Sequence, residues 1–254
     1  MSGGIGIHDL TLGYDGHPAV HHLEGSFAEG SLTAIVGPNG SGKSTLLKGV
    51  MGLLMPLGGH VHRGEGEIAY LPQSAEVDRD FPATVAELIG LGLWKRIGLF
   101  GSIARADRKR IGDALAAVGL EGFARRPIGT LSGGQMQRAL FARVLLQDAP
   151  IILLDEPFTA IDTQTVTDLV ALVQHWHEEG RTVIAVLHDL ELVRHNFPRT
   201  LLLAREPIGW GPTAEVLTEA NLKLAGAMPE AWDERAPWHG NDAPAHDHDH
   251  EVKA

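Results

Sequence analysis

The sequence predicts an α/β fold in which a helical segment is inserted into a core of strands and helices. Three observations support this fold class. A glycine-rich loop, Gly37–Thr45, follows the apolar run Leu32–Val36 and precedes a helix signal at Leu46–Leu53. A second apolar run, Ile151–Asp155, has the pattern of a buried parallel strand. Between these two runs, from about residue 74 onward, the composition becomes helical.

The residues before the glycine loop are expected to form strands joined by turns. Apolar, partly β-branched segments are interrupted there by turn-forming residues, most clearly at Asp15–Pro18. The expected strands are Ile5–Tyr14, Ala19–Ala28 and Ser31–Val36.

The loop itself matches the phosphate-binding pattern G-x-x-x-x-G-K-[ST]. A strand, a glycine loop and a helix in this order direct backbone N–H groups and a helix N-terminus at one anion. Glycine also lets the backbone fold tightly around phosphates. We therefore expect a nucleoside triphosphate, with Lys43 reaching its β- and γ-phosphates and Ser44 ligating Mg²⁺. The expected phosphate-binding residues are Gly37, Pro38, Asn39, Gly40, Ser41, Gly42, Lys43, Ser44 and Thr45.

Tyr14 lies at the end of the first expected strand. A flat aromatic ring can stack on a base without making hydrogen bonds, so Tyr14 is a candidate for stacking on adenine. The alternative is a surface aromatic at a strand end. Taken alone, the residue supports both interpretations equally.

After the loop, the sequence predicts a helix to about Leu54 and then two short strands, His60–Arg63 and Glu67–Leu71. The second strand ends at Pro72-Gln73, where the composition changes.

The helical segment that follows has its clearest helices at Thr84–Leu93 and Asp107–Val118. It also contains a basic stretch that is either a solvated surface or a surface facing anionic lipid headgroups. The basic residues are Lys95, Arg96, Arg105, Arg108, Lys109 and Arg110.

The second half of the chain supplies an acidic pair. Asp155 ends a buried strand, where it can hold Mg²⁺ opposite Ser44. Glu156 is then placed to orient or deprotonate an attacking water. Such pairs also occur by chance, so this assignment depends on the rest of the pattern. The other elements expected here are a helix from Leu131–Gln135 to Gln147, a helix Thr163–Glu178, a strand Thr182–Leu187, a short helix after His188, a hairpin Thr200–Gly211 and a helix Thr213–Gly226.

Composition excludes several classes of protein. The formal net charge of −11 argues against a general nucleic-acid binder. No run approaches the roughly 18 to 20 apolar residues of a membrane span. The N-terminus lacks the basic flank and apolar core of an export signal. Without cysteine the chain has no disulfide and no thiolate metal site.

Together these motifs resemble the ATPase cassette of ABC transporters, and the resemblance covers residues 5 to about 226. The segment Leu131–Gln135 is the signature LSGGQ, which is highly specific when it accompanies a phosphate loop. The D-loop, Thr159–Asp162, departs mildly from the commoner Ser-Ala-Leu-Asp. The other matching segments are Gly37–Thr45 (Walker A), Gln73 (Q-loop), Ile151–Glu156 (Walker B and catalytic glutamate) and His188 (switch histidine).

The resemblance implies a P-loop NTPase fold with a RecA-like core, an N-terminal antiparallel β subdomain and an inserted α-helical subdomain at about 74–147. Residues 1–226 would form this ATPase domain. Residues 227–254, which are acidic and rich in His and Asp, are expected to be a flexible tail.

The resemblance also implies roles for single residues. Tyr14 takes the adenine-stacking position. Gln73 contacts Mg²⁺ and the attacking water, and His188 contacts the γ-phosphate and steadies Glu156. The signature caps ATP bound to a second copy of the chain, so that a homodimer sandwiches two ATP molecules. The residues expected on this opposite face are Ser132, Gly133, Gly134, Gln135 and Asp162.

A stand-alone cassette of this family is typical of uptake systems, in which it drives a separate membrane permease. The run Asp78–Val85 is similar to the cassettes of zinc and manganese importers. In the tail, His246, His248 and His250 alternate with Asp, and such ligands suit Zn²⁺. An unstructured polar tail is the alternative.

We therefore expect an ATP- and Mg²⁺-dependent ATPase that lies peripherally on the cytoplasmic face of the plasma membrane. It would drive uptake of zinc first and manganese second, with permease subunits and, indirectly, a substrate-binding protein as partners, and no nucleic acid. The alternatives are an iron-siderophore or cobalamin importer cassette and a non-transport ABC ATPase such as an iron–sulfur assembly scaffold.

Overall fold

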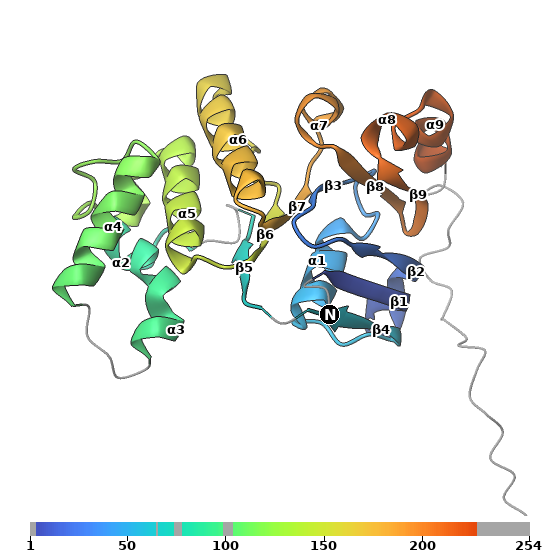
Figure 1. Cartoon of the computed structure of the whole chain (residues 1–254), viewed down its shortest axis with the longest axis horizontal. Helices are drawn as coiled ribbons and strands as arrows, with labels where there is room; N and C mark the ends of the chain where they lie inside the picture. The colour runs from blue at the N-terminus through green and yellow to red at the C-terminus, as the bar shows by residue number, and fades with distance from the viewer. Residues whose placement is uncertain (1–3, 65, 74–77, 99–103, 228–254) are drawn as a thin grey trace, which may run out of the picture.

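The computed structural model describes residues 4–64, 66–73, 78–98 and 104–227, whose arrangement Figure 1 shows. Their strands form an antiparallel sheet of order β2-β1-β4 and a larger sheet of order β5-β6-β7-β3-β8-β9. In the larger sheet the neighbouring strands β5, β6, β7, β3 and β8 pair in parallel, and β9 is antiparallel to β8. The strands are β1 Ile5–Tyr14, β2 His17–Phe27, β3 Leu32–Val36, β4 Gly58–Arg63, β5 Ile68–Leu71, β6 Ile151–Asp155, β7 Thr182–Val186, β8 Arg199–Ala204 and β9 Glu206–Pro212.

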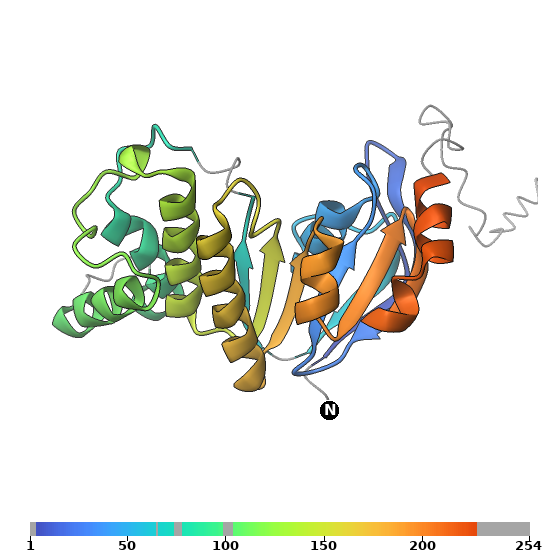
Figure 2. The ribbon, with the colours of Figure 1, turned by 90° about the horizontal axis from the view of Figure 1, so that it is seen from above.

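The helices divide between the core and one end of the molecule. Figure 1 shows α2, α3 and α4 at the end opposite the antiparallel sheet, as expected for an inserted helical segment. Both views show α5 and α6 side by side between that end and the middle of the larger sheet (Figure 2). The helices are α1 Lys43–Met51, α2 Val85–Gly90, α3 Trp94–Ile97, α4 Arg105–Ala117, α5 Gly133–Gln147, α6 Thr163–Glu178, α7 Leu190–Asn196, α8 Thr213–Val216 and α9 Glu219–Ala227.

The larger sheet is buried on both faces, and its residues alternate between two hydrophobic clusters. In β6, Ile151 and Leu153 pack with Leu46 and Leu47 of α1. The intervening residues of β6 pack in the other cluster, which contains α5 and α6. Successive side chains of a strand point to opposite faces, so α1 and α5 lie on opposite sides of the sheet. The phosphate loop, which precedes α1, and the signature, at the start of α5, therefore belong to helices on opposite faces of the sheet.

The predicted α/β class is confirmed, and most predicted elements are found within a few residues of their expected bounds. The helix predicted at Thr213–Gly226 is wrong as a single element, because it is broken between α8 and α9. Leu217 leaves the helical conformation, with ψ at 51°, and the Thr218 hydroxyl accepts a hydrogen bond from Asn221 N. A threonine at that position starts a new helix.

The helix predicted at Thr84–Leu93 has nearly the predicted extent but is not one regular α-helix. It consists of α2 followed by a 3₁₀ turn, Leu91–Leu93. Its start is well defined, because Thr84 and Glu87 form a reciprocal capping box.

Within the described residues, three side chains of the basic stretch are paired with acids. Arg96 forms an ion pair with Asp107, Lys95 with Glu67 at 3.2 Å, and Lys109 with Asp113 at 3.0 Å. Such pairing favours the interpretation of this stretch as a solvated surface.

The contact between α5 and α6 is a testable part of the core. Phe141 is fully buried, and its ring stacks on that of Trp176 with 5.8 Å between centroids. Phe141→Ala should lower the free energy of unfolding by about 3–5 kcal/mol in urea denaturation followed by circular dichroism. Leu224→Ala, at a position that is 53% exposed, is the control and should change it by less than about 0.5 kcal/mol. Similar values for the two variants would contradict the assigned core.

Candidate active site

The phosphate loop connects β3 to α1 in a path that requires glycine at two positions. At Gly37, φ is +155° and a Cβ would lie 1.9 Å from the Leu203 carbonyl oxygen. At Gly42, φ is +91° and a Cβ would lie 2.5 Å from the Ala19 carbonyl oxygen. Neither position admits a side chain without displacing backbone, so the loop is held closely against the neighbouring strands.

Lys43, the first residue of α1, folds back over this loop. Its Nζ donates hydrogen bonds to the carbonyl oxygens of Gly37 (3.0 Å) and Pro38 (2.8 Å). Only 6% of the residue is exposed, and this burial lowers the pKa of Lys43, while the carboxylates of Glu156 and Asp155 act in the opposite direction. The ammonium group therefore lies within the loop, close to where the phosphates of a nucleotide are expected.

Ser44 of α1 and Asp155 at the end of β6 meet on the α1 side of the sheet. The Ser44 hydroxyl donates to Asp155 Oδ1 at 3.0 Å, and Asp155 is 1% exposed. Asp155 points to the α1 side because it continues the alternation of Ile151 and Leu153. These are oxygen donors of the kind that Mg²⁺ prefers, and Mg²⁺ takes its other ligands from water and phosphate. The pair therefore fits a nucleotide-bound Mg²⁺.

Glu156 and His188 form a second pair at the same edge of the sheet. Glu156 Oε1 lies 2.7 Å from His188 Nε2, and both side chains are partly exposed. The Glu156 backbone has φ at +48°, and its N–H donates to Val186 O at 3.2 Å. The carboxyl ends of parallel strands β6 and β7 meet here, so the residues that follow these strands become neighbours.

Gln73 and Tyr14, also predicted from sequence, lie at the ends of strands. Gln73 follows β5, which pairs with β6, so Gln73 is at the edge of the sheet where β6 ends in Asp155. Tyr14 ends β1 and is 49% exposed, which leaves its ring accessible to a ligand.

The signature segment begins α5 and contacts the D-loop of its own chain. Ser132 is the N-cap, and its hydroxyl accepts from Gln135 N while Gln135 Oε1 accepts from Ser132 N. A Cβ on Gly134 would lie 3.5 Å from Asp162 Oδ2. Asp162 caps α6 by accepting hydrogen bonds from Thr165, and these bonds lower the pKa of Asp162. The structure thus places Asp162, at the start of α6, near the signature residues Ser132, Gly133, Gly134 and Gln135 at the start of α5. Both helices pack on the sheet face opposite α1.

Sequence reasoning missed two residues that contact the acidic pair. Tyr70 Oη lies 3.4 Å from Asp155 Oδ2, and Thr159 Oγ1 lies 3.5 Å from Glu156 Oε2. For Tyr70 a signal existed, because an aromatic residue near the end of a strand next to β6 can reach the acid that ends β6.

The predicted metal ligands of the tail are not tested by these contacts. The tail histidines His246, His248 and His250 lie outside the described residues. Within the described ranges no group of three or more His, Asp or Glu side chains is arranged to hold a metal ion. In the same part of the chain, no helix combines the length and the apolar character that crossing a membrane requires.

The loop, its lysine and the acids at the ends of the neighbouring strands define a phosphate-loop nucleoside triphosphatase. The signature helix narrows this class, and the chain belongs to the ABC transporter family, whose sequence profile matches residues 20–159. It is therefore an ATP-binding ATPase that couples hydrolysis to transport.

Curated relatives match most of the chain. A protein of Chlamydia pneumoniae named as a probable metal transport system ATP-binding protein is 44% identical over 218 residues, covering 83% of this chain and 84% of its own. A manganese transport system ATP-binding protein of Listeria monocytogenes is 39% identical and covers 89% and 98%. A zinc transport system ATP-binding protein of Treponema pallidum is 37% identical and covers 87% and 86%. Manganese is named more often than zinc among these and further relatives.

Solved structures show the same fold. An ABC transporter described as of the metal-chelate type, in an inward-facing conformation, has a TM-score of 0.79 at 28% identity and covers 88% of each chain. A bacterial ABC transporter cassette in a dimeric structure has a TM-score of 0.73 at 29% identity and covers 82% of this chain and 98% of its own.

Proposed function

We propose that this protein is the ATPase subunit of an importer that takes up a divalent transition-metal ion, manganese or zinc, through a separate membrane permease. The main support is the identity of 37–44%, over more than four fifths of the chain, to proteins named for metal, manganese or zinc transport. The subunit would bind the permease at the cytoplasmic face of the membrane and would respond through it to a substrate-binding protein.

The residues at the carboxyl edge of the sheet supply the chemistry. Lys43 would donate hydrogen bonds to the β- and γ-phosphates of ATP in place of its loop carbonyls, and Ser44, Asp155 and Gln73 would hold Mg²⁺ directly or through water. When bound, Mg²⁺ neutralises charge that develops on the phosphates. Glu156 then orients and deprotonates the attacking water, while His188 holds the Glu156 carboxylate and reaches the γ-phosphate.

Hydrolysis requires a second copy of the chain. The phosphate loop and the signature lie on helices at opposite faces of one sheet, so a single chain does not bring them to one ATP. In a dimer, the N-terminus of α5 from one copy, with Ser132 and Gly134, caps the γ-phosphate bound to the other. The dimeric structure of a related cassette supports this arrangement. Closure on ATP and reopening after hydrolysis would drive the permease.

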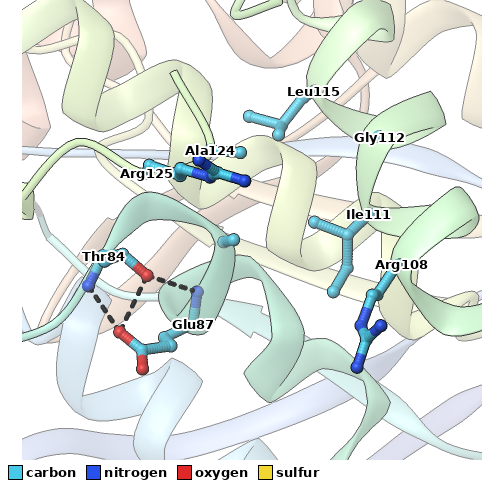
Figure 3. Close-up of a pocket in the computed structure, with 9 residues that line it drawn as sticks. Thr84, Glu87, Arg108, Ile111, Gly112, Leu115, Ala124 and Arg125 are labelled. Carbon is cyan, nitrogen blue, oxygen red and sulfur yellow. Dashed lines mark hydrogen bonds between the residues drawn. The ribbon is translucent and has the colours of Figure 1, made fainter. Parts of the chain in front are cut away.

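The permease is expected to dock on the helical segment, where Figure 3 shows a pocket between α2 and α4. The pocket has a volume of about 440 Å³ and a largely apolar lining that includes Ala86, Ile111 and Leu115. The run Asp78–Val85 leads directly into α2, and within it Phe81 is 62% exposed. An apolar hollow at the start of α2, preceded in the chain by an exposed aromatic, suits a short helix from a partner protein.

Filling this pocket should separate the cassette from its permease. Gly112 lines the pocket on α4, and an added Cβ would meet nothing within 4 Å (Figure 3). Gly112→Trp should therefore leave the fold and the ATPase activity of the isolated cassette unchanged, but reduce copurification with the permease at least about tenfold. Gly112→Ala, which adds a single methyl group, is the matched control and should copurify as the wild type does. Normal copurification of the Trp variant would place the docking site elsewhere.

The transported substrate is identified by ATPase activity of the permease complex in liposomes. A candidate substrate-binding protein is loaded in turn with Mn²⁺, Zn²⁺ or a ferric siderophore. Stimulation by the Mn²⁺- or Zn²⁺-loaded protein alone supports metal-ion uptake and chooses between the ions. Stimulation by the ferric siderophore supports the second candidate, a metal-chelate importer, which the likeness to the metal-chelate type transporter favours.

A further inference from the structure

Tyr70 lies on the same face of the sheet as the acid that it contacts. Ile68 and Tyr70 of β5 belong to the cluster on the α1 side, as do Ile151 and Leu153 of β6. Tyr70 pairs in register with Leu153, two residues before Asp155. The phenol therefore reaches diagonally across the strands, and its Oη lies 3.4 Å from Asp155 Oδ2.

The two oxygens of Asp155 thus have hydroxyl neighbours on different elements. Oδ1 accepts from Ser44 of α1 at 3.0 Å, and Oδ2 faces Tyr70 of β5. A carboxylate that is 1% exposed is costly unless its oxygens accept hydrogen bonds. Two donors that bind different oxygens of one carboxylate also restrict its rotation, which determines where a bound cation can sit.

The strand that carries Tyr70 is held in turn by the signature helix. β5 is at the edge of the sheet, and α5 side chains bind its carbonyl groups. Arg143 Nη2 donates to Tyr70 O at 2.7 Å, and Gln147 Nε2 donates to Ile68 O at 3.2 Å. Burial lowers the pKa of Arg143, and Tyr70 acts in the opposite direction. The helix that begins at the signature is therefore linked to Asp155 through this tyrosine.

We propose that Tyr70 is a positioning residue for Mg²⁺ binding, because its hydroxyl orients Asp155 while Arg143 fixes its backbone to α5. This inference rests on the proposed role of Asp155 at the Mg²⁺ of bound ATP. It assigns Tyr70 no contact with the nucleotide and no part in proton transfer.

Tyr70→Phe tests the proposal, because it keeps the packed ring and removes only the hydroxyl. With the full-length chain, the affinity for a fluorescent ATP analogue is measured at a series of free Mg²⁺ concentrations and in EDTA. Loss of one hydrogen bond should raise the Mg²⁺ concentration for half-maximal effect about 2- to 10-fold, both in binding and in ATP hydrolysis. Affinity in EDTA should stay within about twofold of the wild type.

Thr167→Val is the control, since it also removes a hydrogen-bonded hydroxyl (to Thr163 O, 3.0 Å) but on the exposed side of α6. It should not change the Mg²⁺ dependence. An unchanged Mg²⁺ dependence in Tyr70→Phe would overturn the positioning role, as would an equal loss of affinity in EDTA. A wild-type protein that shows no Mg²⁺ dependence would instead contradict the proposed metal chemistry itself.

Discussion

Glu156→Gln is expected to reduce ATP turnover by about 10²- to 10⁴-fold while ATP still binds. Glutamine preserves the size of the side chain and its contact with His188, 2.7 Å away in the wild type. It removes the negative charge that accepts a proton from water. The phosphate loop, Lys43 and Ser44 are unchanged, so the bound nucleotide should persist and hold two copies together. The measurements are phosphate release, nucleotide binding and molecular mass by size-exclusion chromatography with light scattering, each with and without ATP.

Glu191→Gln provides the matched control. Glu191 is on α7, its side chain is 76% exposed, and it contacts Arg194 of the same helix. Its loss should leave turnover and the oligomeric state unchanged. Hydrolysis by Glu156→Gln at a rate close to that of the wild type would show that another group activates the water.

Lys43→Met should weaken ATP binding about 10- to 100-fold, which corresponds to the loss of a hydrogen bond to a charged group. The ammonium group is buried and donates hydrogen bonds to two loop carbonyls. Burial raises the free energy of the charged group, because it removes water from around it. Removing this charge also removes its desolvation cost, so the thermal midpoint of the nucleotide-free protein should change little. Nucleotide titration and thermal unfolding of the isolated cassette measure the two effects.

The control for this substitution is Lys109→Met, at a surface lysine whose side chain is 79% exposed. Both its ATP affinity and its midpoint should equal those of the wild type. If Lys43→Met bound ATP as tightly as Lys109→Met, the phosphates would have to be held by the backbone of the loop alone.

Local sequence patterns are sufficient to predict the parts of this protein that depend on neighbours along the chain. The glycine loop, the buried strand ending in Asp155, and the capped start of the signature helix all have local signals, because turns, caps and strand patterns depend on adjacent residues. The same is true of the α/β class and of most element bounds. The contact between Glu156 and His188, 2.7 Å in the structure, was expected only from the resemblance to ABC cassettes.

How these elements meet depends on contacts between residues that are far apart in the chain. Tyr70 and Asp155 are 85 residues apart, and their contact arises from the pairing of β5 with β6, which no local pattern specifies. The break between α8 and α9 arises because Thr218 caps a new helix and the first helix does not continue through it. The sequence pattern alone did not distinguish these two possibilities. Likewise, strand order puts α1 and α5 on opposite faces of the sheet. Packing of elements far apart in the chain therefore separates the phosphate loop from the signature within one copy, which composition and spacing alone do not show.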